Sequence, residues 1–247
     1  MTVAAEVAEN YARFSTRWAV ELETSKNGLA NSGRLMASYA RMAAYNGLKE
    51  SVLTPGCSDE CSAFFLEAQN DLLTSHVLAS LGVWRASLQS LRSFLENSLS
   101  GLYFKDHPIE LRLWQAGQTK LAFSELSSYF KKHPDVGSLQ QSVTGVPIIV
   151  AEYATLSKAV HGSAVNMRMT GDGSVRISSS ETARLNAWAT RQTNVVRGVV
   201  LLTLCLNKNQ FTGTRLLPVR SVLGAVLTNT GRTQTRTALS ISIPAYS

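Results

Sequence analysis

The chain has 247 residues, of which 45% are apolar and 17% are charged, and its net charge is +7. This length suits one large or two small globular domains, and the composition excludes a disordered chain or an integral membrane protein. The first ten residues carry two acids and no base, unlike a secretory signal, and three cysteines without framework spacing fit a reducing compartment. We therefore expect a cytoplasmic protein.

The positive charge is concentrated in the last quarter of the chain. Glu181 is the last acidic residue and eight basic residues follow it, whereas residues 1–181 hold 16 basic and 17 acidic residues. Such an uncompensated field attracts nucleic acid or an acidic protein surface, and the sequence leaves both partners open. The residues predicted to contact nucleic acid are Arg184, Arg191, Arg215, Arg220, Arg232 and Arg236.

Residues 3–47 predict two amphipathic helices. Tyr11, Phe14, Trp18 and Leu22 recur at helical spacing, and the period resumes after the breaks that end at Gly33. We expect this aromatic stripe to lie in the core rather than to stack on bases. Residues 1–50 are assigned as an N-terminal helical extension.

The strongest helical period lies between Ser58 and Phe104. Ser58 is a plausible cap, because two acids follow it in the first turn. Apolar residues then recur at three- and four-residue steps, namely Leu81, Trp84, Leu88, Leu91, Leu95, Leu99 and Leu102. Gly82 interrupts the period, so the sequence leaves open one long helix or two stacked helices.

Further helices are predicted around three prolines. One begins at Pro108 and continues, with a bend at Gly117, to the residue before Pro134. A second opens at Pro147 and runs to about His161.

A β-hairpin is predicted near residues 165–177. Val165, Met167 and Met169 alternate with polar residues, Gly171–Gly173 supplies a turn, and Val175 and Ile177 alternate on its far side.

The remaining segment completes the predicted architecture. Ser178 and Glu181 resemble a capping box that starts a last long helix. Its apolar run 195–206 is too short to span a bilayer and predicts a buried helix. Residues 207–247 form a basic C-terminal segment with a short helix at 218–227, followed by an edge strand or a disordered end.

Two stripes of polar residues interrupt apolar helices. One face of the predicted helical segment between Ser58 and Phe104 carries Arg85, Gln89, Arg92 and Glu96. One face of the predicted helix that opens at Pro147 carries Tyr153, Ser157 and His161. Each stripe fits either a solvated face or a functional site. Because a buried polar group without a partner costs roughly 1–3 kcal/mol, we expect the two stripes to face and satisfy each other.

No cofactor or metal is predicted from the motifs. Cys57, Cys61 and the distant His76 lack the paired spacing of zinc ligands. The sequence also lacks a glycine-rich phosphate loop and a nucleophile elbow.

Three short segments resemble the HEPN superfamily, in particular its divergent prokaryotic members linked to phage defence. They are residues 91–96 (LRSFLE), 102–104 (LYF) and 153–162 (YATLSKAVHG). The resemblance implies an all-α helical bundle, usually dimeric, with a core at about 58–206 and the hairpin as an insertion. It also implies either a metal-independent ribonuclease or a non-catalytic RNA-binding or assembly domain.

Carried over by residue, the resemblance assigns His161 as general acid and base in cleavage through the RNA 2′-hydroxyl. Ser157 matches the polar position of the motif, with Tyr153 on the same face. Arg92 would stabilise the phosphate charge and Glu96 would orient Arg92.

The predicted function is a nucleic-acid-directed component, with RNA as ligand, of a prokaryotic defence or toxin system, acting as an endoribonuclease. The alternative is a non-catalytic binding or scaffold subunit, and a homo-oligomer or a partner protein is expected in either case. A DNA-binding regulator is a weaker alternative, because no helix-turn-helix signature supports it.

Overall fold

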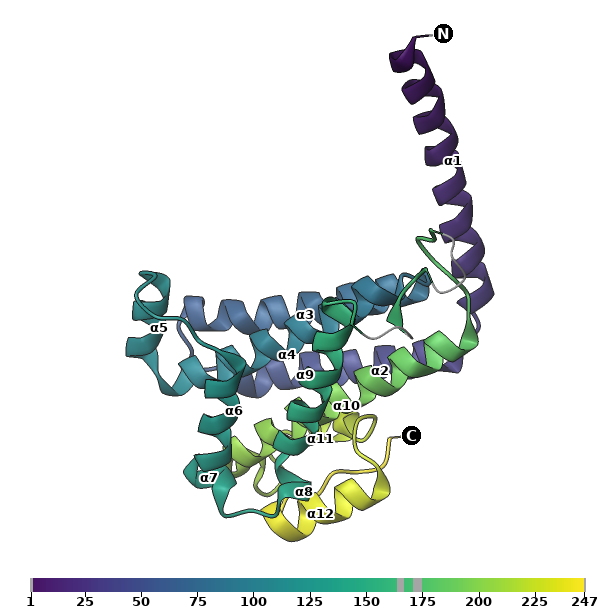
Figure 1. Ribbon diagram of the computed structural model, residues 1–247. Helices are drawn as coiled ribbons and strands as arrows, with labels where there is room; N and C mark the ends of the chain where they lie inside the picture. The colour runs from purple at the N-terminus through teal and green to yellow at the C-terminus, as the bar shows by residue number, and fades with distance from the viewer. Residues whose placement is uncertain (1, 164–166, 171–174, 247) are drawn as a thin grey trace.

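The computed structural model describes residues 2–163, 167–170 and 175–246, and every regular element in that part of the chain is helical. The predicted helical bundle is thus confirmed (Figure 1). Its elements are α1 (Val3–Leu29), α2 (Gly33–Leu48), η1 (Lys49–Leu53), α3 (Asp59–Ser80), α4 (Trp84–Asp106), α5 (Pro108–Gln115), α6 (Phe123–Lys132), α7 (Pro134–Gly137), α8 (Gln141–Thr144), α9 (Val146–Val160), α10 (Thr182–Leu206), η3 (Lys208–Phe211), α11 (Leu217–Leu223) and α12 (Asn229–Leu239).

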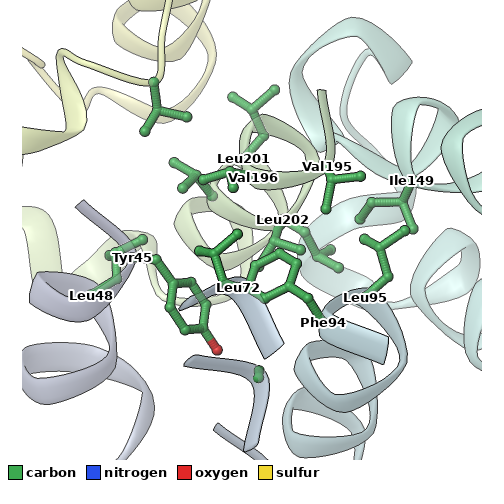
Figure 2. Packing of buried hydrophobic residues seen from close by; sticks show 14 of the residues in the cluster. Tyr45, Leu48, Leu72, Phe94, Leu95, Ile149, Val195, Val196, Leu201 and Leu202 are labelled. Carbon is green, nitrogen blue, oxygen red and sulfur yellow. The ribbon is translucent and has the colours of Figure 1, made fainter. Parts of the chain in front are cut away.

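The core is built around α10. Its second half is apolar on nearly all sides, and the side chains from Val195 to Cys205 are almost entirely buried, as predicted from the apolar run. Such a helix needs cover on every face. Figure 2 shows Val195 and Leu202 among side chains that include Tyr45 of α2 and Phe94 of α4.

Helices α3 and α4 form a hairpin at Gly82, which decides between the two arrangements the sequence left open. Gly82 has a φ of +73°, and a Cβ there would lie 2.3 Å from the carbonyl oxygen of Ser179. Only glycine fits such a conformation and approach without strain. At the other end of α3, Ser58 accepts a hydrogen bond from the Cys61 amide and is the predicted cap.

Two glycines place α9 against α10. Gly145 begins α9 with a φ of +73°, and a Cβ there would lie 2.2 Å from the carbonyl oxygen of Gly198. A Cβ on Gly198 would in turn lie 2.8 Å from Ile149. The start of α9 therefore packs directly on the α10 backbone, and the helix carries Tyr153, Ser157 and His161 away from this crossing.

The predicted hairpin is not seen in the described residues. Met167, Met169, Val175 and Ile177 lie outside any strand, whereas Val165 and the turn Gly171–Gly173 fall outside the described part of the chain.

The backbone donors beyond the expected hairpin have other partners. The amides of Ile177 and Ser178 both donate to Oε1 of Glu21 on α1, at 2.9 Å each. The Ser179 amide donates to the Gly82 carbonyl at 3.1 Å. The predicted capping box is also wrong, because Ser178 bonds to Ser25 of α1 and Glu181 is the N-cap of α10.

Helix α1 projects from the body, and the prediction that its aromatic stripe lies in the core is wrong (Figure 1). Tyr11 is 69% exposed and Phe14 is 53% exposed. Only the C-terminal end of α1 is packed, with Ser25 and Leu29 buried. Amphipathic spacing indicates that a helix has an apolar face, but it does not indicate which element, if any, covers that face.

The C-terminal segment is ordered, with α11 where a short helix was predicted. After α12, Ile241 and Ile243 are buried in a segment without regular secondary structure, which pairs with no strand among the described residues. The backbone of Pro244 to Tyr246 lies against Gly224, where a Cβ would come within 2.5 Å of the Pro244 carbonyl oxygen. Apolar burial rather than sheet pairing holds this end.

A buried polar network joins α2, α3 and α10. Arg41 donates to Gln192 at 2.8 Å, Gln192 donates to the Ser38 hydroxyl at 2.6 Å, and that hydroxyl lies 2.9 Å from Nδ1 of His76. In the bond between Ser38 and His76, a neutral imidazole either accepts the Ser38 proton at Nδ1 or donates its own proton to the hydroxyl, which has a second lone pair. Burial lowers the pKa of His76, and burial together with Arg34 lowers the pKa of Arg41 to about 10.

We expect the free energy of unfolding to fall on acidification through the titration of His76. The folded pKa lies below the ordinary value of 6.5, so between the two values the unfolded chain binds the extra proton. This contribution to stability is complete above pH of about 6.5 and is lost as the pH falls below it. Denaturant unfolding of His76→Gln should show a shallower pH dependence between pH 5 and 7 (roughly the window set by that pKa). Equal slopes in the variant and the wild type would contradict this.

Candidate functional site

The two predicted polar stripes meet, which confirms that Arg92 and Glu96 on α4 face Tyr153 on α9. Arg92 Nη2 donates to the Tyr153 hydroxyl at 2.9 Å, and that hydroxyl donates to Glu96 Oε1 at 3.0 Å. Arg92 Nε also donates to Glu96 Oε1, at 3.2 Å. We name these three residues the α4–α9 clamp, since they join the two helices.

The clamp is stacked on α6. The rings of Tyr153 and Phe123 lie parallel with centroids 3.5 Å apart, and the guanidinium carbon of Arg92 lies 4.9 Å from the Tyr153 centroid. Burial raises the pKa of Tyr153 and Glu96 adds to this effect, although Arg92 opposes it. Burial acts to lower the pKa of Arg92, but Tyr153 and Glu96 outweigh it and the pKa is raised. Tyr153 is therefore a phenol and Arg92 a cation at neutral pH.

Ser157 is not part of the clamp. Its hydroxyl donates to the backbone carbonyl of Tyr153 at 2.8 Å, one turn back on α9. This is the usual internal bond of a helical serine.

His161 lies at the other end of this face, where α9 ends. Gly162 follows it with a φ of +66°, and the Ser163 amide returns to the Lys158 carbonyl, which closes the helix as in a Schellman motif. The His161 side chain is exposed. It is eight residues from Tyr153, or about 12 Å along the helix, so the structure separates His161 from Arg92 and Glu96.

Arginines from three segments converge on this end of α9. Arg85 Nη2 donates to the Val160 carbonyl at 2.8 Å, and Arg168 Nε donates to the Gly162 carbonyl at 3.0 Å. Arg184 Nη1 donates to the Arg168 carbonyl at 2.9 Å. Cations are favoured here because the helix dipole is negative at its C-terminus. We name the group the α9-end patch, which comprises Arg85, Lys158, His161, Arg168 and Arg184.

The α9-end patch has little acidic compensation. Glu181 is the one carboxylate that the described residues pair with any of its members, and it contacts Arg184 at 3.0 Å. Arg85, Lys158 and Arg168 are exposed. The patch therefore presents charged donors to solvent at the helix end that also carries the exposed His161.

A cleft of about 350 Å³ opens between α4, α9 and α10 beside this patch. Trp84, Leu88 and Trp188 give it an apolar lining, while Thr155 and Arg184 add polar groups. Arg184 belongs to both the cleft and the patch. An apolar lining with a few polar groups is typical of small-ligand sites.

The six C-terminal arginines predicted to contact nucleic acid fall into different environments. Arg191 pairs with the buried Glu152 at 3.0 Å, Arg184 pairs with Glu181, and Arg220 is only 5% exposed and donates to the Gly213 carbonyl. Arg215 and Arg236 are exposed, and Arg232 is half-buried beside Asn229. The last three have no carboxylate partner among the described residues.

Sequence reasoning missed Arg168, and it missed Arg85 as a member of a site. Arg85 belongs to the predicted polar stripe of α4, one turn before Gln89. The sequence therefore placed it on the correct helix face, but did not indicate that it reaches the end of α9. Arg168 lies in the segment predicted as a hairpin and carried no signal of its own. The partner of Glu152 was also missed, because Arg191 and Asn194 reach it from α10.

The described residues contain no cluster of three or more histidine, cysteine or carboxylate side chains arranged to hold a metal ion. None of the helices in that part of the chain has both the length and the apolarity to cross a membrane. No protein-family model, curated protein or solved structure matches this chain.

The clamp predicts a measurable effect of Tyr153→Phe. The variant keeps the ring stacked on Phe123 but removes the hydroxyl between Arg92 and Glu96, so we expect a loss of about 1 kcal/mol in the free energy of unfolding. Ser157→Ala is the matched control and should change stability by less than about 0.5 kcal/mol. Denaturant unfolding measures both, and equal effects of the two substitutions would contradict the assignment.

Proposed function

We propose that this protein binds RNA at the α9-end patch. The observation that supports the proposal is the convergence of Arg85, Arg168 and Arg184 on the terminal turn of α9, with Lys158 and His161 exposed beside them. Arginine presents several donors in one plane and matches phosphate oxygens. The adjoining cleft of about 350 Å³, with Met167 and Thr155 in its lining, gives a nucleobase a place beside the patch.

Each arginine of the patch has donors left for a ligand. Arg85 uses Nη2 and Arg168 uses Nε in the bonds to the α9 carbonyls, whereas a guanidinium carries five N–H groups. The carbonyl bonds fix the position of each guanidinium, so less side-chain entropy is lost when a phosphate binds.

Arg215, Arg232 and Arg236 supply a second, sequence-independent contact in this proposal. Arg232 and Arg236 are four residues apart on α12 and thus share one side of that helix. With Arg215 they are the solvent-accessible arginines of the basic C-terminal segment that no carboxylate of the described residues pairs, whereas Arg220 is buried. The net charge of +7 favours association with a polyanion in general.

The binding proposal is tested with a labelled single-stranded RNA by fluorescence anisotropy over a series of salt concentrations. Arg85→Gln combined with Arg168→Gln should weaken binding. It should flatten the slope of log affinity against log salt by about 0.7 for each phosphate that the variant no longer binds. Arg215→Gln combined with Arg236→Gln should act in the same direction.

Lys131→Gln combined with Lys132→Gln is the charge-matched control, because both lysines are exposed on α6 away from the patch. An RNA affinity that falls equally in the control would show that only net charge matters. An affinity that does not change in any variant would overturn the proposal.

A second candidate function is metal-independent RNA cleavage at the same patch, favoured by the exposed imidazole of His161, which follows the residue whose carbonyl Arg85 binds. In this reaction neutral His161 accepts the proton of a 2′-hydroxyl, whose oxygen then attacks the adjacent phosphorus. The bond from phosphorus to the 5′-oxygen breaks and that oxygen takes up a proton, which leaves a 2′,3′-cyclic phosphate and a 5′-hydroxyl. Arg85, rather than the more distant Arg92, stabilises the phosphorane charge.

For cleavage, we expect His161→Ala to abolish product formation while RNA affinity changes by less than a few fold, since one side chain of the patch is removed. Ser157→Ala should keep the activity, because its hydroxyl is used within α9. The products are identified by mass, with 2′-O-methyl RNA as an uncleavable control. Cleavage of the 2′-O-methyl strand, or wild-type rates in His161→Ala, would exclude this mechanism.

The resemblance to HEPN proteins adds a biological setting to the proposal, namely a component of a prokaryotic defence or toxin system acting in the cytoplasm. The alternative is a non-catalytic scaffold, favoured by the α4–α9 clamp, whose donors and acceptors satisfy one another as in a structural network. If the protein binds RNA but does not cleave it, the non-catalytic alternative holds, with RNA as a ligand of the subunit.

A further inference from the structure

The projecting half of α1 carries a continuous apolar stripe that nothing in the described chain covers. Its residues are Val3, Val7, Tyr11, Phe14 and Trp18, and the same face continues through Leu22, Ser25 and Leu29, which are packed at the body. The steps of four, four and three residues make an 11-residue repeat, which stays on one side of a nearly straight helix. The end of this stripe enters the body at Ser25 and Leu29, whereas all side chains from Thr2 to Val20 except Ser15 are exposed.

The anchored end of α1 is tied down by specific contacts. Glu21 accepts from two backbone amides, Ser25 bonds to Ser178 at 2.9 Å, and a Cβ on Gly28 would lie 2.9 Å from the Cβ of Ser180. The helix therefore leaves the body in a defined direction (Figure 1). Helical stability in proteins comes mostly from packing of an apolar face, and the first 20 residues of α1 lack such packing within the described chain.

We infer that the stripe is the contact surface for a second copy of this chain, with the two α1 helices packed antiparallel about a two-fold axis at Tyr11. This inference is independent of the proposed RNA function. In this register Val7 lies opposite Phe14 and Val3 lies opposite Trp18. Small side chains then face large ones, as close packing requires.

The charges beside the stripe support the same register. Glu6 and Arg17 are 11 residues apart and so share one edge of α1, and neither makes an ion pair within the described part of the chain. In an antiparallel pair the two-fold axis brings the same edge of both helices together. Glu6 of each copy then meets Arg17 of the other, twice per dimer.

A parallel pair is disfavoured by the same residues. It would place each aromatic ring against its own copy, and it would bring the edge with Glu6 against the opposite edge, which carries Ala4, Ala8 and Ser15.

The antiparallel pair also leaves the bodies roughly 40 Å apart along the helices, without a clash. Six half-exposed rings and the valines provide on the order of 1,000 Å² of apolar area, near the size of small specific interfaces.

Cysteine cross-linking tests the register in a Cys57→Ser background, which removes the one half-exposed native thiol. Tyr11→Cys should form a disulfide dimer with itself on mild oxidation. Val3→Cys should not cross-link with itself, but it should cross-link when mixed with Trp18→Cys. Self-cross-linking of Val3→Cys, or the absence of self-cross-linking for Tyr11→Cys, would overturn the antiparallel arrangement.

Light scattering tests the dimer itself, with a mass of twice 26.8 kDa expected for the wild type. Phe14→Asp should give a monomer whose body keeps its cooperative unfolding transition, since Phe14 is exposed and has no role in the core. Glu6→Arg alone and Arg17→Glu alone should each weaken dimerisation about tenfold, and the two combined should restore it. A wild-type monomer, including one that sediments with phosphatidylglycerol vesicles, or a double variant weaker than both single variants, would overturn the inference.

Discussion

The constraint on which the structure depends is that the second half of α10 is apolar on nearly every side. A helix of this kind is stable in water only when other elements surround it, and the side chains from Val195 to Cys205 are almost fully buried. Helices α2, α4, α8 and α9 all pack on it. Where the cover must come closest, at Gly145 and Gly198, the chain has no Cβ to obstruct the contact. The position of α9, and with it the candidate site, follows from this crossing.

The polar residues of α9 divide into two groups with different physical characters. Tyr153 is engaged with Arg92 and Glu96, so the clamp resembles a structural network in which each group already has its partner. His161 stands at a helix end, where exposed carbonyls and the dipole gather cations. A self-satisfied cluster has little left to offer a ligand, whereas the α9-end patch keeps unpaired donors and an exposed imidazole. The proposed chemistry is therefore centred on His161 and Arg85.

Helix α1 is packed against the body at one end only. Its C-terminal end is held by Glu21, Ser25 and Gly28, and its N-terminal half presents aromatic rings to solvent. The same 11-residue repeat runs through both parts, so one apolar surface continues from the body into the projecting arm. Continuity of this kind links the packing of the monomer to the proposed contact between copies, and the edge formed by Glu6 and Arg17 makes that contact selective.

Much of the architecture was determined by the sequence alone. Helix positions, the Ser58 cap, the buried run in α10 and the meeting of Arg92 with Tyr153 follow from local periodicity and from the cost of unpaired polar groups. The tertiary structure decided what lies outside local range. The amides of Ile177 and Ser178 bond to Glu21 because that carboxylate lies close in space, although it is far away in the chain. Likewise, Arg85 and Arg168 converge on the end of α9, and Arg191 forms an ion pair with Glu152. The apolar stripe in the projecting part of α1 stays exposed to solvent. Spacing along a helix tells which residues share a face, but only the packing of distant segments decides what that face meets.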